Sequence, residues 1–146
     1  MTEIWSILLA IGYAVIGLYS FMIIYAITGW KKLKIQDEKS PWLGVSILIS
    51  ARNESENIET VIKDIFNQNY ITDLFELIVI DDNSEDDTLQ KANDLKPEFP
   101  NLKVLSNGTE VGKKTALQKG IIAARFGTIA TVDADCRVPS EWLITM

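Results

Sequence analysis

Hydrophobic and polar residues follow two different patterns in this chain, one before and one after about residue 40. From Ile4 to Trp30 the sequence IWSILLAIGYAVIGLYSFMIIYAITGW contains no charged residue. As a helix, this run would be about 40 Å long, whereas the hydrocarbon core of a bilayer is about 30 Å thick. The run is therefore long enough to cross a membrane with some tilt.

A cleaved signal peptide and a buried core helix are the alternatives for this run. A signal peptide has a basic start and a shorter apolar region that ends in small residues. Here the only charge before the run is Glu3, and the run ends in Trp30. Together with Trp5 and Tyr25, Trp30 is typical of residues at a membrane surface. We expect residues 1–30 to form a transmembrane anchor.

The charges beside the run predict its orientation. Lys31, Lys32 and Lys34 follow it, and no lysine or arginine precedes it. Basic residues favour the cytoplasmic side, and they also suit anionic lipid headgroups. We therefore expect a single-pass membrane protein with a linker over residues 31–43 and a soluble domain in the cytoplasm.

Residues 44–146 alternate between short apolar runs and helical patterns. This order predicts an α/β fold, a Rossmann-like and mainly parallel sheet with flanking helices. The predicted strands are Val45–Ser50, Phe75–Asp81, Leu102–Ser106 and Thr128–Ala134.

Helices are predicted after each of these strands. The first has a buried face at helical spacing, made by Ile58, Val61, Ile62, Ile65 and Phe66. The second begins at Ser84, which with Asp87 forms an acidic version of a capping box, and ends near Asp94. The third covers 113–125, and its predicted buried face consists of Leu117, Ile121 and Ala124. A further helix begins near Pro139.

Composition restricts the chemistry that this chain can perform. It has no histidine, one cysteine (Cys136) and a net charge of −6, and residues 41–146 carry 10 basic and 17 acidic side chains. The missing histidine excludes Ser-His-Asp and Cys-His catalysis within the chain, and the acidic balance argues against a nucleic-acid partner. A metal would have to be held by oxygen atoms, which favours Mg²⁺ or Mn²⁺.

Acidic and polar residues gather where the predicted strands end. The first strand ends in SARNE, the second in DDNSEDD and the fourth in DADC. The carboxyl ends of parallel strands meet at one edge of the sheet, which is where ligands bind in such folds. Neither G-x-G-x-x-G nor G-x-x-x-x-G-K-[ST] is present, so a nucleotide would need another way to neutralise its phosphates.

Asp133 and Asp135 are separated by one small residue, and a divalent ion between them would relieve their repulsion. Mg²⁺ typically binds one or two carboxylates together with substrate phosphates. The alternative is that each aspartate only caps a turn after the strand.

Ordinary structural roles explain part of the remaining pattern. Asn53 and Glu56 have the spacing of a helix-capping pair, which leaves Arg52 unexplained. Lys113 and Lys114 begin a helix, which is the unfavourable end of the helix dipole for a cation unless a phosphate lies nearby.

Four motifs follow one another in order along the soluble part. They are VSILISARNESENIETVIKDIFNQNY, FELIVIDDNSEDDT, GKKTALQKGI and GTIATVDADCRVPSEWL. Together they closely resemble the nucleotide-binding half of family-2 glycosyltransferases with a GT-A-type fold, over about residues 44–146. The amino-terminal anchor resembles that of membrane-associated members of this family.

The resemblance implies a role for each matching residue. Ala51, Arg52 and Glu54 would line the nucleoside, although many members have a tyrosine in place of Arg52. Asp82 would bind the base and Lys113 would lie near the diphosphate, where many members have a glycine in place of the following Lys114. Asp135 would be the direct ligand of Mg²⁺ or Mn²⁺, with Asp133 near the ribose and the metal.

The implied reaction is sugar transfer with inversion, from a nucleoside-diphosphate sugar to an acceptor hydroxyl of a polysaccharide, lipid or similar molecule. The general base of such enzymes lies well beyond the D-x-D motif. We therefore expect it beyond Met146, and we expect these residues alone to be inactive. A membrane-anchored module that binds a nucleotide or metal without catalysis is the alternative. A signalling receiver domain fits less well, because the third strand ends in Ser106 instead of an aspartate.

Overall fold

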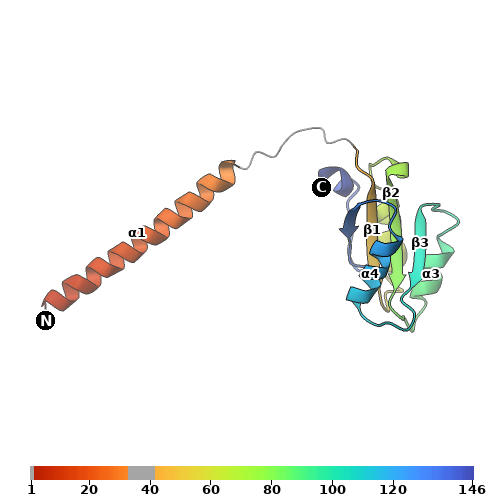
Figure 1. Ribbon diagram of the computed structural model, residues 1–146, viewed down its shortest axis with the longest axis horizontal. Coiled ribbons are helices and arrows are strands. Elements are labelled where there is room, and N and C mark those ends of the chain that lie inside the picture. Colours follow the sequence, from red (N-terminus) through yellow and green to blue (C-terminus); the bar gives the residue numbers. More distant parts are fainter. Residues whose placement is uncertain (1, 33–41) are drawn as a thin grey trace. The chain divides into compact units, whose positions relative to one another are not determined.

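The computed structural model describes residues 2–32 and 42–146 (Figure 1). Nearly all of the predicted linker, including Lys34, lies outside the described residues. The chain divides into two units, Met1–Ser40 and Pro41–Met146, and each is described by itself. The first contains helix α1 (Thr2–Lys32). Its stretch Glu3–Thr28 has a mean hydropathy of 2.3 and is long and apolar enough to cross a membrane.

The second unit is built on a four-stranded parallel sheet with the order β3-β2-β1-β4, which confirms the predicted fold class. The strands are β1 (Val45–Ala51), β2 (Phe75–Asp81), β3 (Leu102–Ser106) and β4 (Thr128–Thr131). β4 is shorter than predicted. Val132 still donates its amide to Leu48 O at 3.0 Å, but the chain turns at Asp133, whose carbonyl accepts a hydrogen bond from the amide of Cys136.

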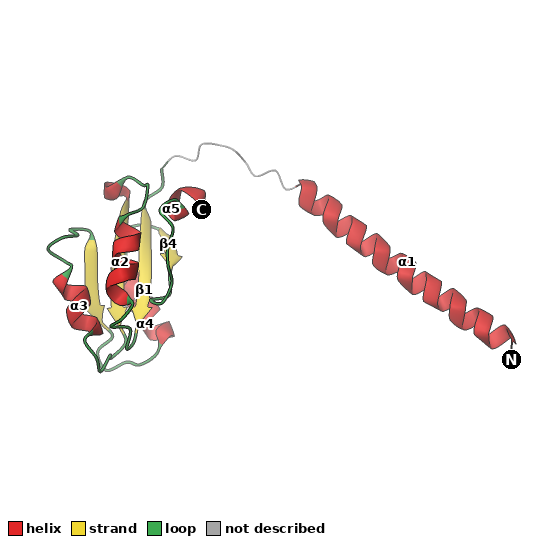
Figure 2. Ribbon diagram, turned by 180° about the vertical axis from the view of Figure 1, so that it is seen from behind, coloured by secondary structure: helices red, strands yellow, loops and turns green. Residues whose placement is uncertain are grey.

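Helices cover both faces of the sheet (Figures 1 and 2). Helices α2 (Ile58–Phe66) and α3 (Thr88–Asp94) lie on one face, and α4 (Lys113–Ala123) lies on the other. A short 3₁₀ helix, Thr72–Leu74, precedes β2, and α5 (Trp142–Thr145) follows the turn after β4. Since helices cover both faces, the central strands β1 and β2 are apolar over most of their length.

Helix α2 has the buried face that its sequence predicts. Ile58, Val61, Ile62 and Ile65 are fully buried. Phe66 is only partly buried, and its ring stacks on that of Phe99 with centroids 4.3 Å apart. The regular spacing of large apolar side chains therefore predicted this face correctly.

The buried face predicted for α4 was wrong. Ile121 is 52% exposed, and the buried residues of this helix are Ala116 and Gly120. A Cβ atom on Gly120 would lie 2.8 Å from the Cδ1 atom of Ile80, so only a glycine allows the helix to approach the sheet this closely. Close approach selects small residues, which carry little hydrophobic signal in the sequence.

Candidate functional site

The carboxyl ends of β1, β2 and β4 surround a cavity of about 290 Å³. Eight residues line it: Ser50, Arg52, Glu54, Asp82, Lys113, Asp133, Ala134 and Asp135. The tertiary structure thus brings together six of the seven residues that the resemblance implied, from four separate parts of the sequence. The parallel sheet explains this arrangement, because its strands all end at this edge.

Ala51 is the seventh predicted residue, and its side chain does not line the cavity. It is fully buried in the core, while its carbonyl oxygen accepts a hydrogen bond from the amide of Asp82 at 2.8 Å. Successive side chains of a strand point to opposite faces, so Ser50 and Arg52 lie on the cavity side instead. The same alternation in the sequence could have identified Ser50.

The loop after β1 is hydrogen-bonded to the loop after β2. The amide of Asn53 donates to Ser84 Oγ at 3.0 Å, and the amide of Glu85 donates to Asn53 Oδ1 at 2.8 Å. Asn53 has a φ of 56°, in the left-handed region that asparagine tolerates better than most residues. Ser84 and Asn53 therefore join the two loops that carry the nucleoside-side residues.

Both capping predictions at these loops were wrong. Helix α3 begins at Thr88, later than expected, and α2 begins at Ile58, so neither Ser84 nor Asn53 precedes a helix directly. Neither helix has a side-chain cap from its N-cap residue. A short polar side chain can bond to any nearby amide, and here the amides of the facing loop are the partners.

Asp86 strengthens the same connection between the loops. Its carboxylate accepts hydrogen bonds from the hydroxyl and the amide of Thr88, and from the amide of Ser55 at 3.1 Å. The Thr88 hydroxyl in turn accepts a hydrogen bond from the amide of Glu54 at 2.8 Å. These donors, led by the Thr88 hydroxyl, lower the pKa of Asp86 to about 2. The main chain of Glu54 is thus held beside the cavity.

Asp82 is buried, with 4% of its surface exposed, and it organises the start of α4. Its carboxylate accepts hydrogen bonds from Asn107 Nδ2 at 2.7 Å and from the amide of Gly112 at 2.9 Å. Gly112 has a φ of 116°, which favours glycine. Asn107 was not recognised in the sequence, where it only follows a strand as an ordinary loop residue.

Lys113 and Asp133 form an ion pair at the mouth of the cavity. Lys113 Nζ lies 2.5 Å from Asp133 Oδ1, and both side chains are more than half exposed. The hydrogen bond to Asp133 raises the pKa of Lys113, and the charge of Asp135 adds to this effect. A lysine therefore neutralises part of the charge of the aspartate pair.

Asp133 and Asp135 are the two carboxylates of the turn that follows β4. Within residues 2–32 and 42–146, no group of three His, Cys, Asp or Glu side chains is arranged to hold a metal ion. The protein offers two carboxylates at the cavity, which matches the way Mg²⁺ binds through one or two carboxylates and completes its shell with phosphates and water. The donor set therefore fits an ion that arrives together with a diphosphate.

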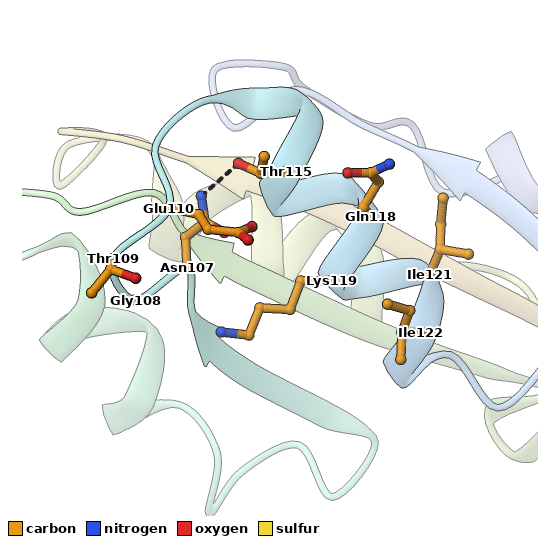
Figure 3. Close-up of a pocket in the computed structure, with 9 residues that line it drawn as sticks. All are labelled: Asn107, Gly108, Thr109, Glu110, Thr115, Gln118, Lys119, Ile121 and Ile122. Atoms are coloured by element: carbon orange, nitrogen blue, oxygen red, sulfur yellow. Dashed lines mark hydrogen bonds between the residues drawn. The ribbon is translucent and has the colours of Figure 1, made fainter.

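A larger hollow, of about 770 Å³, lies along α4 and the loop that precedes it (Figure 3). Its lining comprises Asn107, Gly108, Thr109, Glu110, Thr115, Gln118, Lys119, Ile121 and Ile122. Glu110 is its one acidic residue, and none of the seven predicted site residues lines it. Its size therefore does not make it the better candidate for binding a charged donor.

The chain was compared with known protein families and solved structures. The family model for glycosyl transferase family 2 matches residues 46–146. The chain is 32% identical over 143 residues to a beta-monoglucosyldiacylglycerol synthase of Nostoc sp., a match that covers 96% of this chain and 30% of that protein. It spans about a third of the length of the first relatives that it matches.

Two solved structures have a similar fold. The mannosyltransferase PcManGT from Pyrobaculum calidifontis, in complex with GDP-Man and Mn²⁺, superimposes with a TM-score of 0.68 at 24% identity, over 79% of this chain and 34% of that one. The glucosyl-3-phosphoglycerate synthase from Mycobacterium tuberculosis, in complex with Mn²⁺, UDP and glucosyl-3-phosphoglycerate, has a TM-score of 0.52 at 27% identity, over 63% and 33% of the two chains.

Proposed function

Because this chain belongs to glycosyl transferase family 2, we propose that it is the donor-binding part of an inverting glycosyltransferase. The enzyme would move a sugar from a nucleoside-diphosphate sugar to an acceptor hydroxyl. The observation that carries this proposal is the cavity at the strand ends, which gathers Arg52, Asp82, Lys113 and the Asp133–Asp135 pair. The Mn²⁺ complexes of the two similar structures, with GDP-Man and with UDP, support it.

Arg52, Glu54 and Asp82 are the proposed contacts of the nucleoside. Arg52 is exposed beside the cavity, so its planar guanidinium is available to stack on a base. Asp82 is fixed by Asn107 and Gly112, which leaves its carboxylate in one orientation as a hydrogen-bond acceptor. Ala51 would contribute through its main chain, which holds that of Asp82.

Lys113, Asp133 and Asp135 are the proposed contacts of the diphosphate and of Mg²⁺ or Mn²⁺. When bound, the divalent ion supplies positive charge that stabilises the departing nucleoside diphosphate. Asp135 is the proposed direct ligand, and Asp133 faces the metal and the ribose. Lys113 already sits beside Asp133, so it adds a cation at the position where phosphate charge would arrive.

The first unit of the chain is the proposed membrane anchor. Helix α1 is long and apolar enough to span a bilayer over Glu3–Thr28. Lys31 and Lys32 at its carboxyl end support an orientation in which the second unit lies in the cytoplasm. A reporter fused after residue 40 should then be inaccessible to membrane-impermeant labelling from outside the cell, and efficient labelling would contradict this orientation.

Calorimetry on the full chain in detergent tests donor binding. We expect UDP or GDP to bind in the presence of Mn²⁺ and to lose that binding when a chelator is added. Equal affinity with and without the chelator would contradict the metal assignment. If neither nucleotide bound with Mn²⁺ present, the proposed donor-binding function would be wrong.

A further inference from the structure

The segment after the Asp133–Asp135 turn is fastened to the last turn of α2. Asp64 accepts hydrogen bonds from the guanidinium of Arg137 at 2.7 Å and 3.3 Å, and from the amide of Val138 at 3.3 Å. The hydrogen bond from Arg137 lowers the pKa of Asp64, in spite of the opposing effect of its partial burial. The carboxylate therefore remains charged at neutral pH and holds both groups.

Gln68 lies one helical turn beyond Asp64 and is only 7% exposed. Its side-chain amide donates to Pro139 O at 2.7 Å, and its side-chain carbonyl accepts from the amide of Leu143 at 3.0 Å. These bonds connect residues that are more than seventy positions apart in the sequence. A buried amide whose oxygen and nitrogen both bond to one distant segment fixes that segment in place.

The aspartate turn is held at both ends as a result. Before it, the amide of Val132 bonds to Leu48 O in the sheet, and after it Arg137 and Val138 bond to Asp64. A loop this short with fixed ends has few conformations, whereas release of one end would add conformational freedom. Ala134 is buried between the two exposed aspartates, which ties the turn further to the core.

We propose that Asp64 and Gln68 are positioning residues for Asp133 and Asp135, which they place for the divalent ion and the diphosphate. This inference rests on the proposed function. Neither residue lines the cavity, so both act through the segment after the turn and not by contact with the donor. In metal sites, groups that orient the ligands commonly change metal affinity 10- to 100-fold when they are lost.

Hydrogen exchange on the ligand-free full chain in detergent tests the positioning itself. We expect the amides of residues 133–138 to exchange faster in Gln68→Leu and in Asp64→Asn, while those of β1 keep their wild-type rates. Glu59→Gln is the matched control, because it removes an exposed ion pair with Lys63 on the same helix without touching the turn. Wild-type exchange of residues 133–138 in both variants would overturn the proposal, whether or not the chain binds nucleotides.

Electron paramagnetic resonance of free Mn²⁺, titrated in the presence of UDP or GDP well below the unfolding temperature, gives the second readout. We expect the Mn²⁺ concentration for half-saturation to rise about tenfold in Gln68→Leu and Asp64→Asn, and to stay unchanged in Glu59→Gln. A lower unfolding temperature with unchanged Mn²⁺ affinity would show a merely structural role and would overturn the proposal. Absence of Mn²⁺ and nucleotide binding in the wild-type chain would instead refute the proposed function, and the exchange experiment would still decide the positioning.

Discussion

Lys113 donates a hydrogen bond of 2.5 Å to Asp133, so the first residue of α4 contacts the turn that follows β4. The ammonium group reduces the repulsion between Asp133 and Asp135 in the absence of a donor. It also occupies one oxygen of a proposed metal-site residue. Donor binding is thus expected to rearrange this ion pair instead of filling a preformed metal shell.

Replacement Lys113→Met separates these two effects. We expect the affinity for UDP or GDP with Mn²⁺ to fall about threefold to tenfold, because an exposed charge that meets the diphosphate is lost. The affinity for Mn²⁺ alone should not fall, because Asp133 loses a competing partner. Lys114→Met, which changes the next residue of the same helix, is the control and should leave nucleotide affinity within about twofold of the wild type. An equal loss in both variants would contradict a specific role for Lys113.

Replacement Asp135→Asn tests the proposed direct metal ligand. We expect the residual nucleotide binding to become insensitive to Mn²⁺, because a neutral amide is a poor ligand for a hard cation. Calorimetry with and without a chelator measures this directly. Asp87→Asn is the matched control, because Asp87 is an exposed acid that does not line the cavity. Retained Mn²⁺ dependence in Asp135→Asn would rule out the assignment.

Glu76 should be important for stability and not for binding, because it lies at the opposite end of β2 from the cavity. Only 3% of it is exposed, and it accepts hydrogen bonds from Ser46 Oγ at 2.6 Å and from the amide of Arg125, with Lys103 Nζ at 2.8 Å. We expect Glu76→Gln to lower the free energy of unfolding by about 2 kcal/mol, since its amide nitrogen would face these donors. Urea denaturation measures the loss. An unchanged midpoint would show that the site relaxes without cost.

The stability contributed by Asp86 should depend on pH in a defined range. The hydrogen bonds from Thr88 lower the pKa of Asp86 from 3.8 to about 2 in the folded chain. The unfolded state therefore binds the proton first, so the stabilising contribution is complete above pH 3.8 and is lost as the pH falls from there towards about 2. Urea denaturation across this range should show a steeper acid loss for the wild type than for Asp86→Asn. Parallel curves would contradict the prediction.

Gly120 tests the close approach of α4 to the sheet. Gly120→Ala places a Cβ atom 2.8 Å from Ile80 Cδ1 and 3.2 Å from Leu48 Cδ2, both within the core. We expect a net destabilisation of about 1 kcal/mol, because overpacking outweighs the gain in helix propensity. Gly127→Ala is the control, since its Cβ atom would have open space, and it should be neutral. Equal stability of both variants would show that the core adjusts freely.

The sequence by itself was sufficient for the elements with strong periodicity and for the location of the site. The apolar spacing of α2, from Ile58 to Ile65, identified its buried face, and the βα alternation predicted a parallel sheet. A parallel sheet places all strand ends at one edge, so the approach of Asp82 to Asp133 followed from topology without knowledge of any contact.

Only the tertiary structure decided which polar groups are partners and which small residues are buried. Ser84 bonds to the Asn53 amide instead of capping α3, and Gly120 instead of Ile121 faces the core of α4. Gln68 reaches across to the segment after the aspartate turn. A short polar side chain has several possible partners, and close packing selects small residues whose sequence signal is weak, so these contacts depend on the assembled fold.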